Sequence, residues 1–282
     1  MAKKTKPILV LGSTGKTGSR VVPQLREKGF EVRAAGRSAE TVFDWDDDAT
    51  WEAALTGTGA VYVVDLQDKP GQWDAEAALR EFYARAVELG VRRLVVLQAR
   101  ATGLVGGKDL HSGETAVRES GAEWTILRPN WFNQNFDEGV LVDGILAGEL
   151  PLPAGDGVEP FIDVADVAAV AVAALTGDGH DGQVYELSGT EALSFHEAVA
   201  TIGEAIGKPV TYLPVSQDAY EAELVEYGIA ADYARFVGDL VGQIRAGTSG
   251  GVTGTFARVM GREPITFEDF AKDAASRGAW RG

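Results

Sequence analysis

The feature that most constrains this chain is a glycine-rich turn close to its N-terminus. The apolar run Ile8-Leu9-Val10-Leu11 is followed by Gly12-Ser-Thr-Gly15-Lys-Thr-Gly18 and then by an amphipathic stretch. This order predicts a buried strand, a tight turn and a helix, the context that a dinucleotide-binding motif requires. Gly12 would permit the bend, Gly15 would let a phosphate approach the backbone, and Gly18 would let the helix pack on the strand. Free N–H groups and the helix dipole attract a pyrophosphate at such a turn.

Strands and helices alternate through the rest of the first half. After a helix over residues 19–28, the pattern predicts strands over 30–35, 60–64, 93–97 and 124–127 and helices over 50–55, 75–89 and 112–120. Continuous apolar strands that alternate with helices are typical of a parallel sheet covered on both faces. Because the crossovers in such sheets are right-handed, we predict an α/β fold with a doubly wound parallel Rossmann sheet.

The pattern changes beyond about residue 130. Two glycine-containing loops (148–157 and 177–182), strands over 184–187 and 210–214, and helices that end near Leu175 or span 195–206, 218–245 and 266–277 follow. We predict a dinucleotide-binding domain over residues 1–150 and a smaller α/β substrate-binding portion over 151–282, with residues around 160–190 completing the sheet. The glycine-rich segment 247–254 is expected to be the most mobile, and its composition alone suggests a lid.

The composition excludes several classes of protein. The 42 acidic residues outnumber the 26 basic ones, giving a net charge of −16, which disfavours a nucleic-acid or membrane partner. The chain has no cysteine, and His111, His180 and His196 lack the spacing of a metal site, so no metal is expected. No apolar run approaches the roughly 20 residues of a membrane span, and no signal peptide is visible. We therefore expect a cytoplasmic protein.

The end of the second predicted strand indicates which nucleotide is bound. An NAD site usually carries an acidic residue about 20 positions beyond the glycines, bonded to the ribose 2′-hydroxyl. This chain has Arg37 and Ser38 there instead. A guanidinium clamps a phosphate through two hydrogen bonds, so Arg37, assisted by Ser38 and Lys16, predicts NADPH/NADP as the cofactor. The alternative is an exposed loop arginine without a ligand.

Several further segments resemble one family. Besides the glycine turn and Arg37-Ser38, they are Phe43-Asp44-Trp45, the run from Ser120 to Phe132, Phe161-Ile-Asp-Val-Ala-Asp166 and the run from Gly261 to Phe270. Over nearly its whole length the chain resembles the NmrA-like group of atypical short-chain dehydrogenases/reductases, and residues 124–136 are similar to its ergot-alkaloid-type reductase branch. The resemblance implies either a reductase of quinones, imines or conjugated carbonyls, or a redox sensor that binds dinucleotide without turnover.

The predicted cofactor site gathers residues from the glycine turn and from the ends of the next strands. The resemblance implies that Asp44 and Trp45 lie near the adenine. Asp65, just after a strand, is expected to reach the ribose, with a turn residue as the alternative. The complete set is Gly12, Ser13, Thr14, Gly15, Lys16, Thr17, Gly18, Arg37, Ser38, Asp44, Trp45, Asp65 and Gln98.

The proton donor of ordinary short-chain dehydrogenases is missing. Those enzymes use a Tyr-x-x-x-Lys pair, and none of the seven tyrosines here has a lysine four residues later. His111 is the candidate that we predict in its place, because histidine titrates near neutrality, and Glu114 one helical turn on would orient the imidazole. The alternative is that His111 caps a helix or bonds the cofactor.

Polar and aromatic residues follow the strand of residues 124–127, at the sheet edge where ligands bind. The predicted substrate pocket consists of Glu114, Asn130, Trp131, Phe132, Asn135 and Phe136.

We predict a NADPH-dependent reductase that transfers hydride to a small electrophilic imine, quinone, enone or carbonyl. The alternatives are a redox sensor that binds a protein partner and an enzyme that uses the fold for a non-redox step. A homodimer is left open.

Overall fold

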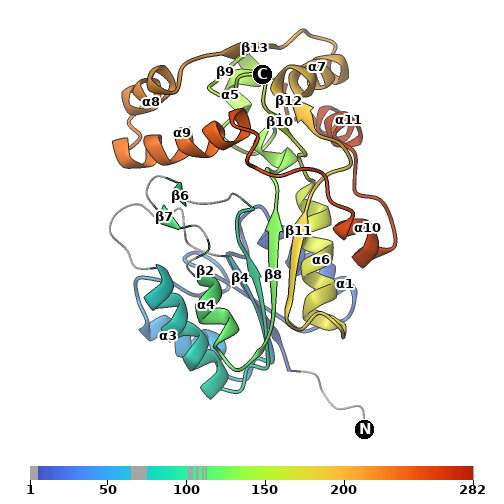
Figure 1. Cartoon of the computed structure of the whole chain (residues 1–282). Coiled ribbons are helices and arrows are strands. Elements are labelled where there is room, and N and C mark those ends of the chain that lie inside the picture. Colours follow the sequence, from blue (N-terminus) through green and yellow to red (C-terminus); the bar gives the residue numbers. More distant parts are fainter. Residues whose placement is uncertain are drawn as a thin grey trace.

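The computed structural model describes residues 6–64, 75–100, 104–105, 108–109, 111 and 113–281. Seven parallel strands form one sheet in the order β11-β8-β5-β4-β1-β2-β3 (Figure 1). They are β1 (Ile8–Leu11), β2 (Val32–Gly36), β3 (Thr41–Val42), β4 (Ala60–Val64), β5 (Arg93–Leu97), β8 (Glu123–Pro129) and β11 (Gln183–Leu187). The strand order reverses between β1 and β4, so the predicted doubly wound Rossmann sheet is confirmed.

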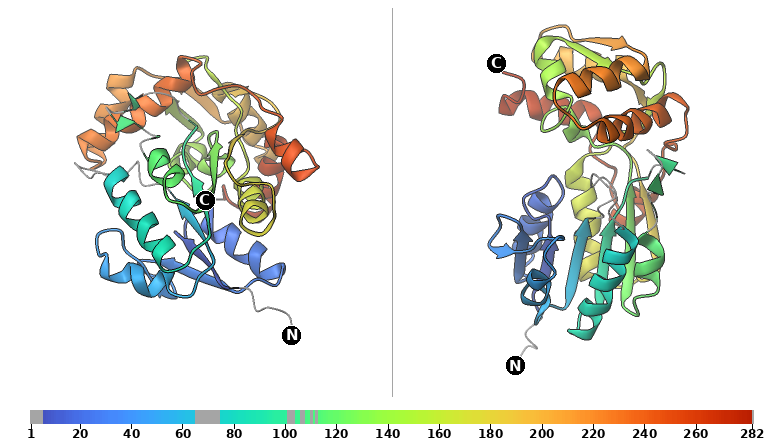
Figure 2. Two further views of the ribbon diagram at one scale, coloured as in Figure 1. Left: turned by 60° about the horizontal axis from the view of Figure 1, so that its bottom comes forward. Right: turned by 90° about the vertical axis from the view of Figure 1, so that its left-hand side faces the viewer.

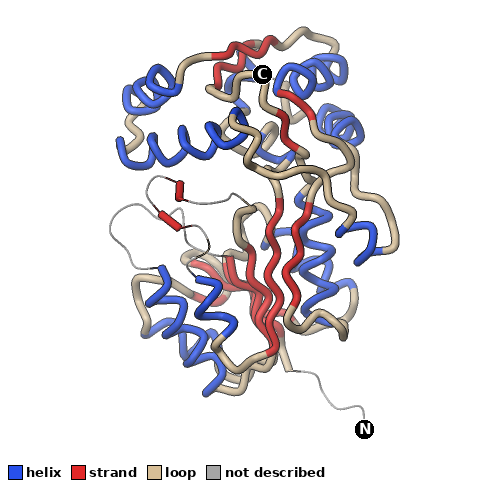
Figure 3. Tube along the Cα trace, in the orientation of Figure 1, coloured by secondary structure: helices blue, strands red, loops and turns tan. Residues whose placement is uncertain are grey.

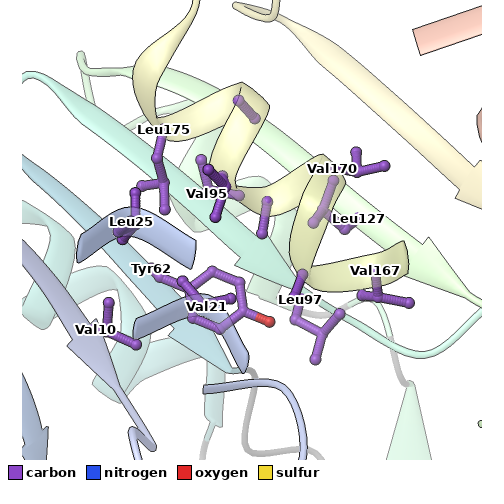
Figure 4. Packing of buried hydrophobic residues seen from close by; sticks show 14 of the residues in the cluster. Val10, Val21, Leu25, Tyr62, Val95, Leu97, Leu127, Val167, Val170 and Leu175 are labelled. Atoms are coloured by element: carbon purple, nitrogen blue, oxygen red, sulfur yellow. The ribbon is translucent and has the colours of Figure 1, made fainter. Parts of the chain in front are cut away.

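Helices cover both faces of this sheet, as the two views of Figure 2 show. One face carries α1 (Gly18–Glu27) and α6 (Val164–Thr176), and the other carries α2 (Ala49–Leu55), α3 (Ala75–Glu88) and α4 (Gly113–Arg118). Alternate strand residues point to opposite faces. Tyr62, Val95 and Leu127 therefore pack under α1 and α6, in the cluster that Figure 4 shows.

The second half of the chain lies over the carboxyl ends of the strands, where Figure 3 shows short strands among helices. It contains η1 (Asn133–Asn135), α5 (Val142–Ala147), β9 (Glu149–Leu152), β10 (Val158–Glu159), β12 (Leu193–Ser194), α7 (Phe195–Ile206), β13 (Thr211–Pro214), α8 (Gln217–Glu226), α9 (Ala231–Arg245) and α11 (Phe267–Arg277). Its core is built around Phe136, Phe161, Phe195 and Phe267. We call this layer the cap. The short α10 (Thr255–Met260) packs on α6 and β11 instead.

The cap differs from the sequence prediction in its short elements. The predicted loop 148–157 contains β9, which pairs in parallel with β13, and β10 follows it and pairs with β12. The predicted helix 218–245 is two helices, α8 and α9, because the chain turns at Gly228, whose φ is +87°. The two-stranded β6 (Leu104–Val105) and β7 (Lys108–Asp109) pair were not predicted either. Short elements of this kind carry little periodic signal.

The glycine-rich segment 247–254 is hydrogen-bonded to other parts of the protein at several positions. The carbonyl of Ser249 accepts from Asn130 Nδ2 at 3.1 Å, and the carbonyl of Gly251 accepts from Arg100 Nη1 at 2.6 Å. At its end, the N–H of Thr253 donates to Ser188 Oγ at 2.8 Å, and the Thr253 hydroxyl donates to the carbonyl of Glu186 at 2.8 Å. The mobility of this segment and a lid function stay predictions.

Backbone hydrogen bonds connect the segments that run between sheet and cap. Asn130 N–H donates to the carbonyl of Leu187 at 2.8 Å, and Ile162 N–H donates to that of Trp131 at 2.9 Å. The division at residue 150 stays a prediction. Among the described residues, no helix is both long and apolar enough to cross a bilayer.

Candidate active site

The glycine-rich turn has the shape that a pyrophosphate needs. Gly12 has a φ of +62°, and a Cβ at Gly18 would lie 2.2 Å from the carbonyl oxygen of Gly12. Gly12 therefore has the positive φ that the predicted bend requires, and Gly18 has no room for a side chain, while their contacts with a cofactor stay predictions. The first turn of α1 holds no acidic residue, and Thr14 and Gly15 are exposed above it. Ser13 and Thr17 are buried. This turn fits the phosphates of a dinucleotide, because the exposed Thr14 and Gly15 leave the amino end of α1 accessible among the described residues.

Arg37 and Ser38 follow β2 directly, and both are exposed. Within the described residues, the Arg37 guanidinium forms no hydrogen bond or ion pair. An exposed cation at the carboxyl end of β2 fits the 2′-phosphate of NADPH. That contact stays a prediction, and Asp65 lies outside the described residues.

Asp44 and Trp45 form the rim of the sheet beside β3. The carbonyl of Asp44 accepts from Trp51 Nε1 at 2.9 Å, and its Oδ1 accepts from the N–H of Asp46 at 3.1 Å. Trp45 packs edge-on against Phe43, with ring centroids 5.0 Å apart. Both residues therefore hold a turn in place, and an adenine contact stays a prediction.

A cavity of about 410 Å³ lies where the carboxyl ends of β4, β5 and β8 face α9. The predicted residues Lys16, Gln98, Asn130, Trp131, Phe132 and Asn135 line it. Sequence reasoning missed the other lining residues, which include Arg100, Glu159, Ser249 and, on α9, Tyr233, Phe236, Val237 and Leu240. The apolar spacing of residues 236, 237 and 240 is a helical signal that identifies the buried face of α9. An acid between apolar residues, as in Val158-Glu159-Pro160-Phe161, also marks an unusual buried position.

Lys16 reaches this cavity from the glycine turn. A Cβ on Gly139 would lie 3.0 Å from Lys16 Nζ, and Lys16 is half-buried. Burial lowers the pKa of Lys16, whereas the carboxylates of Glu138 and Asp137 oppose that shift. The structure thus places this cation at the cavity wall.

A buried polar network borders the cavity around Asn130. The Asn130 amide donates to Glu159 Oε1 at 2.7 Å and to the carbonyl of Ser249 at 3.1 Å, and its oxygen accepts from Arg100 Nη1 at 2.5 Å. Trp131 N–H donates to the same Glu159 oxygen at 3.0 Å. Burial raises the pKa of the Glu159 carboxyl, although Ser249, Trp131, Asn130 and the charge of Arg100 act in the opposite direction. The cavity therefore has a polar wall opposite the apolar face of α9.

Three predicted site residues are placed elsewhere. Phe136 does not line the cavity; it is fully buried in the cap core, against Phe161 and Phe267. The chain turns through η1 after β8, which sends this ring into the cap. Glu114 does not orient an imidazole, because its carboxylate pairs with Arg128 and with Arg118.

His111 is held by the segment that follows β5. Its Nε2 lies 3.1 Å from the carbonyl oxygen of Ala99, and it is not among the described residues that line the cavity. This imidazole–backbone contact is neither a helix cap nor a contact with a cofactor. The catalytic role of His111 and its alternatives, a helix cap or a bond to the cofactor, stay predictions.

Comparison with known proteins identifies the class. Residues 12–178 match the model of the NAD(P)H-binding family. The chain is 35% identical to the uncharacterized oxidoreductase YesF of Bacillus subtilis (strain 168), over 98% of this chain and 97% of the relative. It is 32% identical to the NAD(P)H azoreductase of Xenophilus azovorans (96% and 99%) and 29% identical to the agroclavine dehydrogenase of Claviceps fusiformis (97% and 98%). The chain belongs to this NAD(P)H-binding family, and the prediction of an NAD(P)H-dependent oxidoreductase is confirmed.

Solved structures share the fold. A NADPH-dependent quinone oxidoreductase from Escherichia coli, complexed with NADPH, has a TM-score of 0.81 at 23% identity and covers 94% of this chain and 99% of its own. NmrA, a negative transcriptional regulator in complex with NAD, has a TM-score of 0.72 at 15% identity, with 98% of each chain covered. The predicted resemblance to the NmrA-like group is therefore confirmed.

Proposed function

We propose that this chain is a NADPH-dependent reductase that transfers hydride to a small electrophilic organic substrate, an imine, quinone, enone or carbonyl. The observation that supports it is the cavity of about 410 Å³ beside the glycine turn, with a mostly apolar lining and a few converging polar groups. Its volume suits a one- or two-ring molecule next to a nicotinamide. The names of the azoreductase and agroclavine dehydrogenase relatives agree with organic acceptors of this kind.

Each part of the chain then has a distinct task. NADPH supplies the hydride. The glycine turn holds the pyrophosphate, and Arg37 holds the 2′-phosphate and so favours NADPH over NADH. Trp131 and Phe132, together with Phe236 on α9, exclude water from the cavity and orient the acceptor. An acceptor that is already electrophilic suits a site without the Tyr–Lys pair, because it needs less help from an acid.

Transfer of deuterium from 4-deuterated NADPH, labelled on either face, tests the proposal. The protein is mixed with a panel of imines, quinones, enones and aldehydes, and mass spectrometry follows the label into each product. Label in one class of product is the expected result. Gly18→Ala, in which the pyrophosphate turn is disturbed, is the control and should yield much less labelled product at the same subsaturating NADPH concentration. If NADPH binds and no product carries label, the reductase proposal is wrong, and a regulator such as NmrA becomes the better model.

A further inference from the structure

Glu159 and Ser249 each place a buried polar atom at the cavity without a regular hydrogen bond among the described residues. The atoms are Glu159 Oε2 and Ser249 Oγ, and both residues border the cavity, with exposures of 0% and 6%. The Ser249 hydroxyl is close enough to the carboxyl to lower its pKa, although the two groups do not adopt regular hydrogen-bond geometry among the described residues. Buried polar atoms without partners are costly, so their position beside a cavity indicates that a ligand completes the set.

Burial raises the pKa of this carboxyl, so Glu159 holds a proton to a higher pH than an exposed glutamate does. Glu159 Oε1 already accepts from Asn130 and Trp131, so Oε2, toward Ser249, is the oxygen that would carry that proton. The other charged or titratable groups that line the cavity are Lys16, Arg100 and Tyr233. Arg100 is engaged by Asn130 Oδ1 and the carbonyl of Gly251, so it has fewer donors left for a ligand.

We propose that Glu159 and Ser249 form the proton-donating pair of the reductase, in place of the absent Tyr–Lys pair. This inference rests on the proposed function, since it assigns the proton that hydride transfer to a neutral acceptor requires. The ligand class that it selects is a neutral C=O, C=N or quinone acceptor whose heteroatom lies against the Ser249 hydroxyl.

The step balances without any further reactant. The hydride adds to the electrophilic carbon, and the electron pair of the double bond moves to the heteroatom. That heteroatom takes the proton of Ser249 Oγ, while Ser249 takes the proton of Glu159 Oε2. Glu159 remains as a carboxylate that Asn130 and Trp131 stabilise through Oε1, and it regains a proton from water after product release.

Paired acceptors test the assignment. 1,4-Naphthoquinone needs a proton at oxygen, whereas malachite green, a triarylmethyl cation, becomes neutral on hydride addition and needs none. With NADPH in stopped-flow measurements, Glu159→Gln and Ser249→Ala should slow naphthoquinone reduction about 100-fold, within the range of general acid catalysis. Both variants should reduce malachite green within about threefold of the wild-type rate. Equal slowing of both acceptors, or no slowing of either, would overturn the proposal.

Both variants should preserve the fold. The glutamine carbonyl in Glu159→Gln still accepts from Asn130 and Trp131, and Ser249 Oγ forms no regular hydrogen bond within the described part of the chain. The matched control is Glu149→Gln, an identical change at an exposed position on β9, which should reduce both acceptors as the wild type does.

A binding measurement separates this inference from the proposed function. 1-Naphthol has different absorbance spectra as phenol and as phenolate, so its ionisation can be read in the complex with protein and NADP⁺. A hydrogen-bond donor stabilises the phenolate, so the pKa of bound 1-naphthol should be lower in the wild type than in Ser249→Ala. If this difference appears and no acceptor is reduced, the donor pair stands and the reductase function is wrong. If the bound spectrum is the same in both proteins, the pair does not face the ligand and the inference is wrong.

Discussion

The glycine-rich turn and the cavity lie side by side but are built from different parts of the molecule. The turn is one continuous segment of seven residues, and its backbone is the part that we expect to bind the pyrophosphate. The cavity takes one residue, Lys16, from the turn, and its other lining residues come from β4, β5, β8, β10 and α9 and from the segments after β5, β8 and α9. The proposed cofactor contacts therefore depend on local geometry, whereas the proposed substrate contacts depend on how distant segments of the chain pack together.

This difference predicts how each region tolerates change. The turn has no spare volume, since a single methyl group at Gly18 would collide with the backbone. The cavity wall on α9 is more tolerant, because among the described residues the hydrophobic neighbours of Phe236 are Tyr233, Val237 and Leu240 of its own helix. Substrate preference can thus change by substitution on α9 while cofactor binding is preserved.

The largest expected effect is a loss of stability that distinguishes Phe136, in the cap core, from Phe236, at the cavity. Phe136→Ala should lower the free energy of unfolding by about 3–5 kcal/mol, because the ring is fully buried in the cap core. Phe236→Ala should cost about 1–2 kcal/mol and raise the KM for aromatic acceptors roughly 10-fold, because that ring faces the cavity. Urea unfolding and steady-state kinetics measure the two effects. If the two variants lost the same amount of stability, Phe136 and Phe236 could not be assigned to the core and to the cavity in this way.

Gly18→Ala tests the turn itself. The added Cβ would lie 2.2 Å from the Gly12 carbonyl oxygen, so the turn must open and the dissociation constant for NADPH should rise about 100-fold, or ~2.7 kcal/mol. Calorimetric titration measures it. The control is Gly254→Ala, at a glycine whose Cβ would meet no atom within 4 Å. Unchanged affinity in Gly18→Ala would show that the phosphates bind elsewhere.

Arg37→Ala should have a smaller effect that depends on the nucleotide. We expect the dissociation constant for NADPH to rise about 10- to 30-fold, the worth of one charge-assisted phosphate contact, while that for NADH stays the same. Arg26→Ala, at an exposed site on α1, is the control. A parallel loss for both nucleotides would mean that Arg37 does not contact the 2′-phosphate.

The smallest effect concerns the stability of the polar wall at different pH values. Burial raises the pKa of Glu159 above its ordinary 4.5, so the folded state binds more protons than the unfolded state between these two values. The free energy of unfolding of the wild type should therefore fall as the pH rises through this window. Glu159→Gln should not show this fall in the free energy of unfolding, which amounts to about 1.4 kcal/mol for each unit of pKa shift. Urea unfolding from pH 4 to 8 checks it, and parallel profiles would contradict the buried ionisation.

Local patterns predicted the parts of the site that are local. The glycine turn and the strand ends that bear Lys16, Gln98 and Asn130 could be placed from sequence, because the carboxyl edge of a parallel sheet gathers ligand-binding residues. Phe136 could not, since its direction depends on the turn at η1. An aromatic residue just past a strand fits a core and a cavity equally well.

The polar wall was beyond sequence reasoning for a different reason. Glu159 lies 29 residues after Asn130, and Ser249 lies 90 residues after Glu159. The fold of the cap brings the three residues together. The sequence predicted one helix over 218–245 and missed the turn at Gly228, so the orientation of α9 could not be predicted. Contacts between residues that are far apart in the sequence produce no periodic pattern.

The position of β11 has a consequence for how the protein is made. This strand covers the edge of β8, and it follows α6, which covers the sheet face. During synthesis β8 remains an unpaired edge until residues 183–187 have left the ribosome, and unpaired edges promote aggregation. A fragment that ends at residue 178, where the family match ends, would keep that edge permanently open. Nascent chains of this protein therefore pass through a stage in which a holding chaperone is of most use, just before the last strand of the sheet emerges.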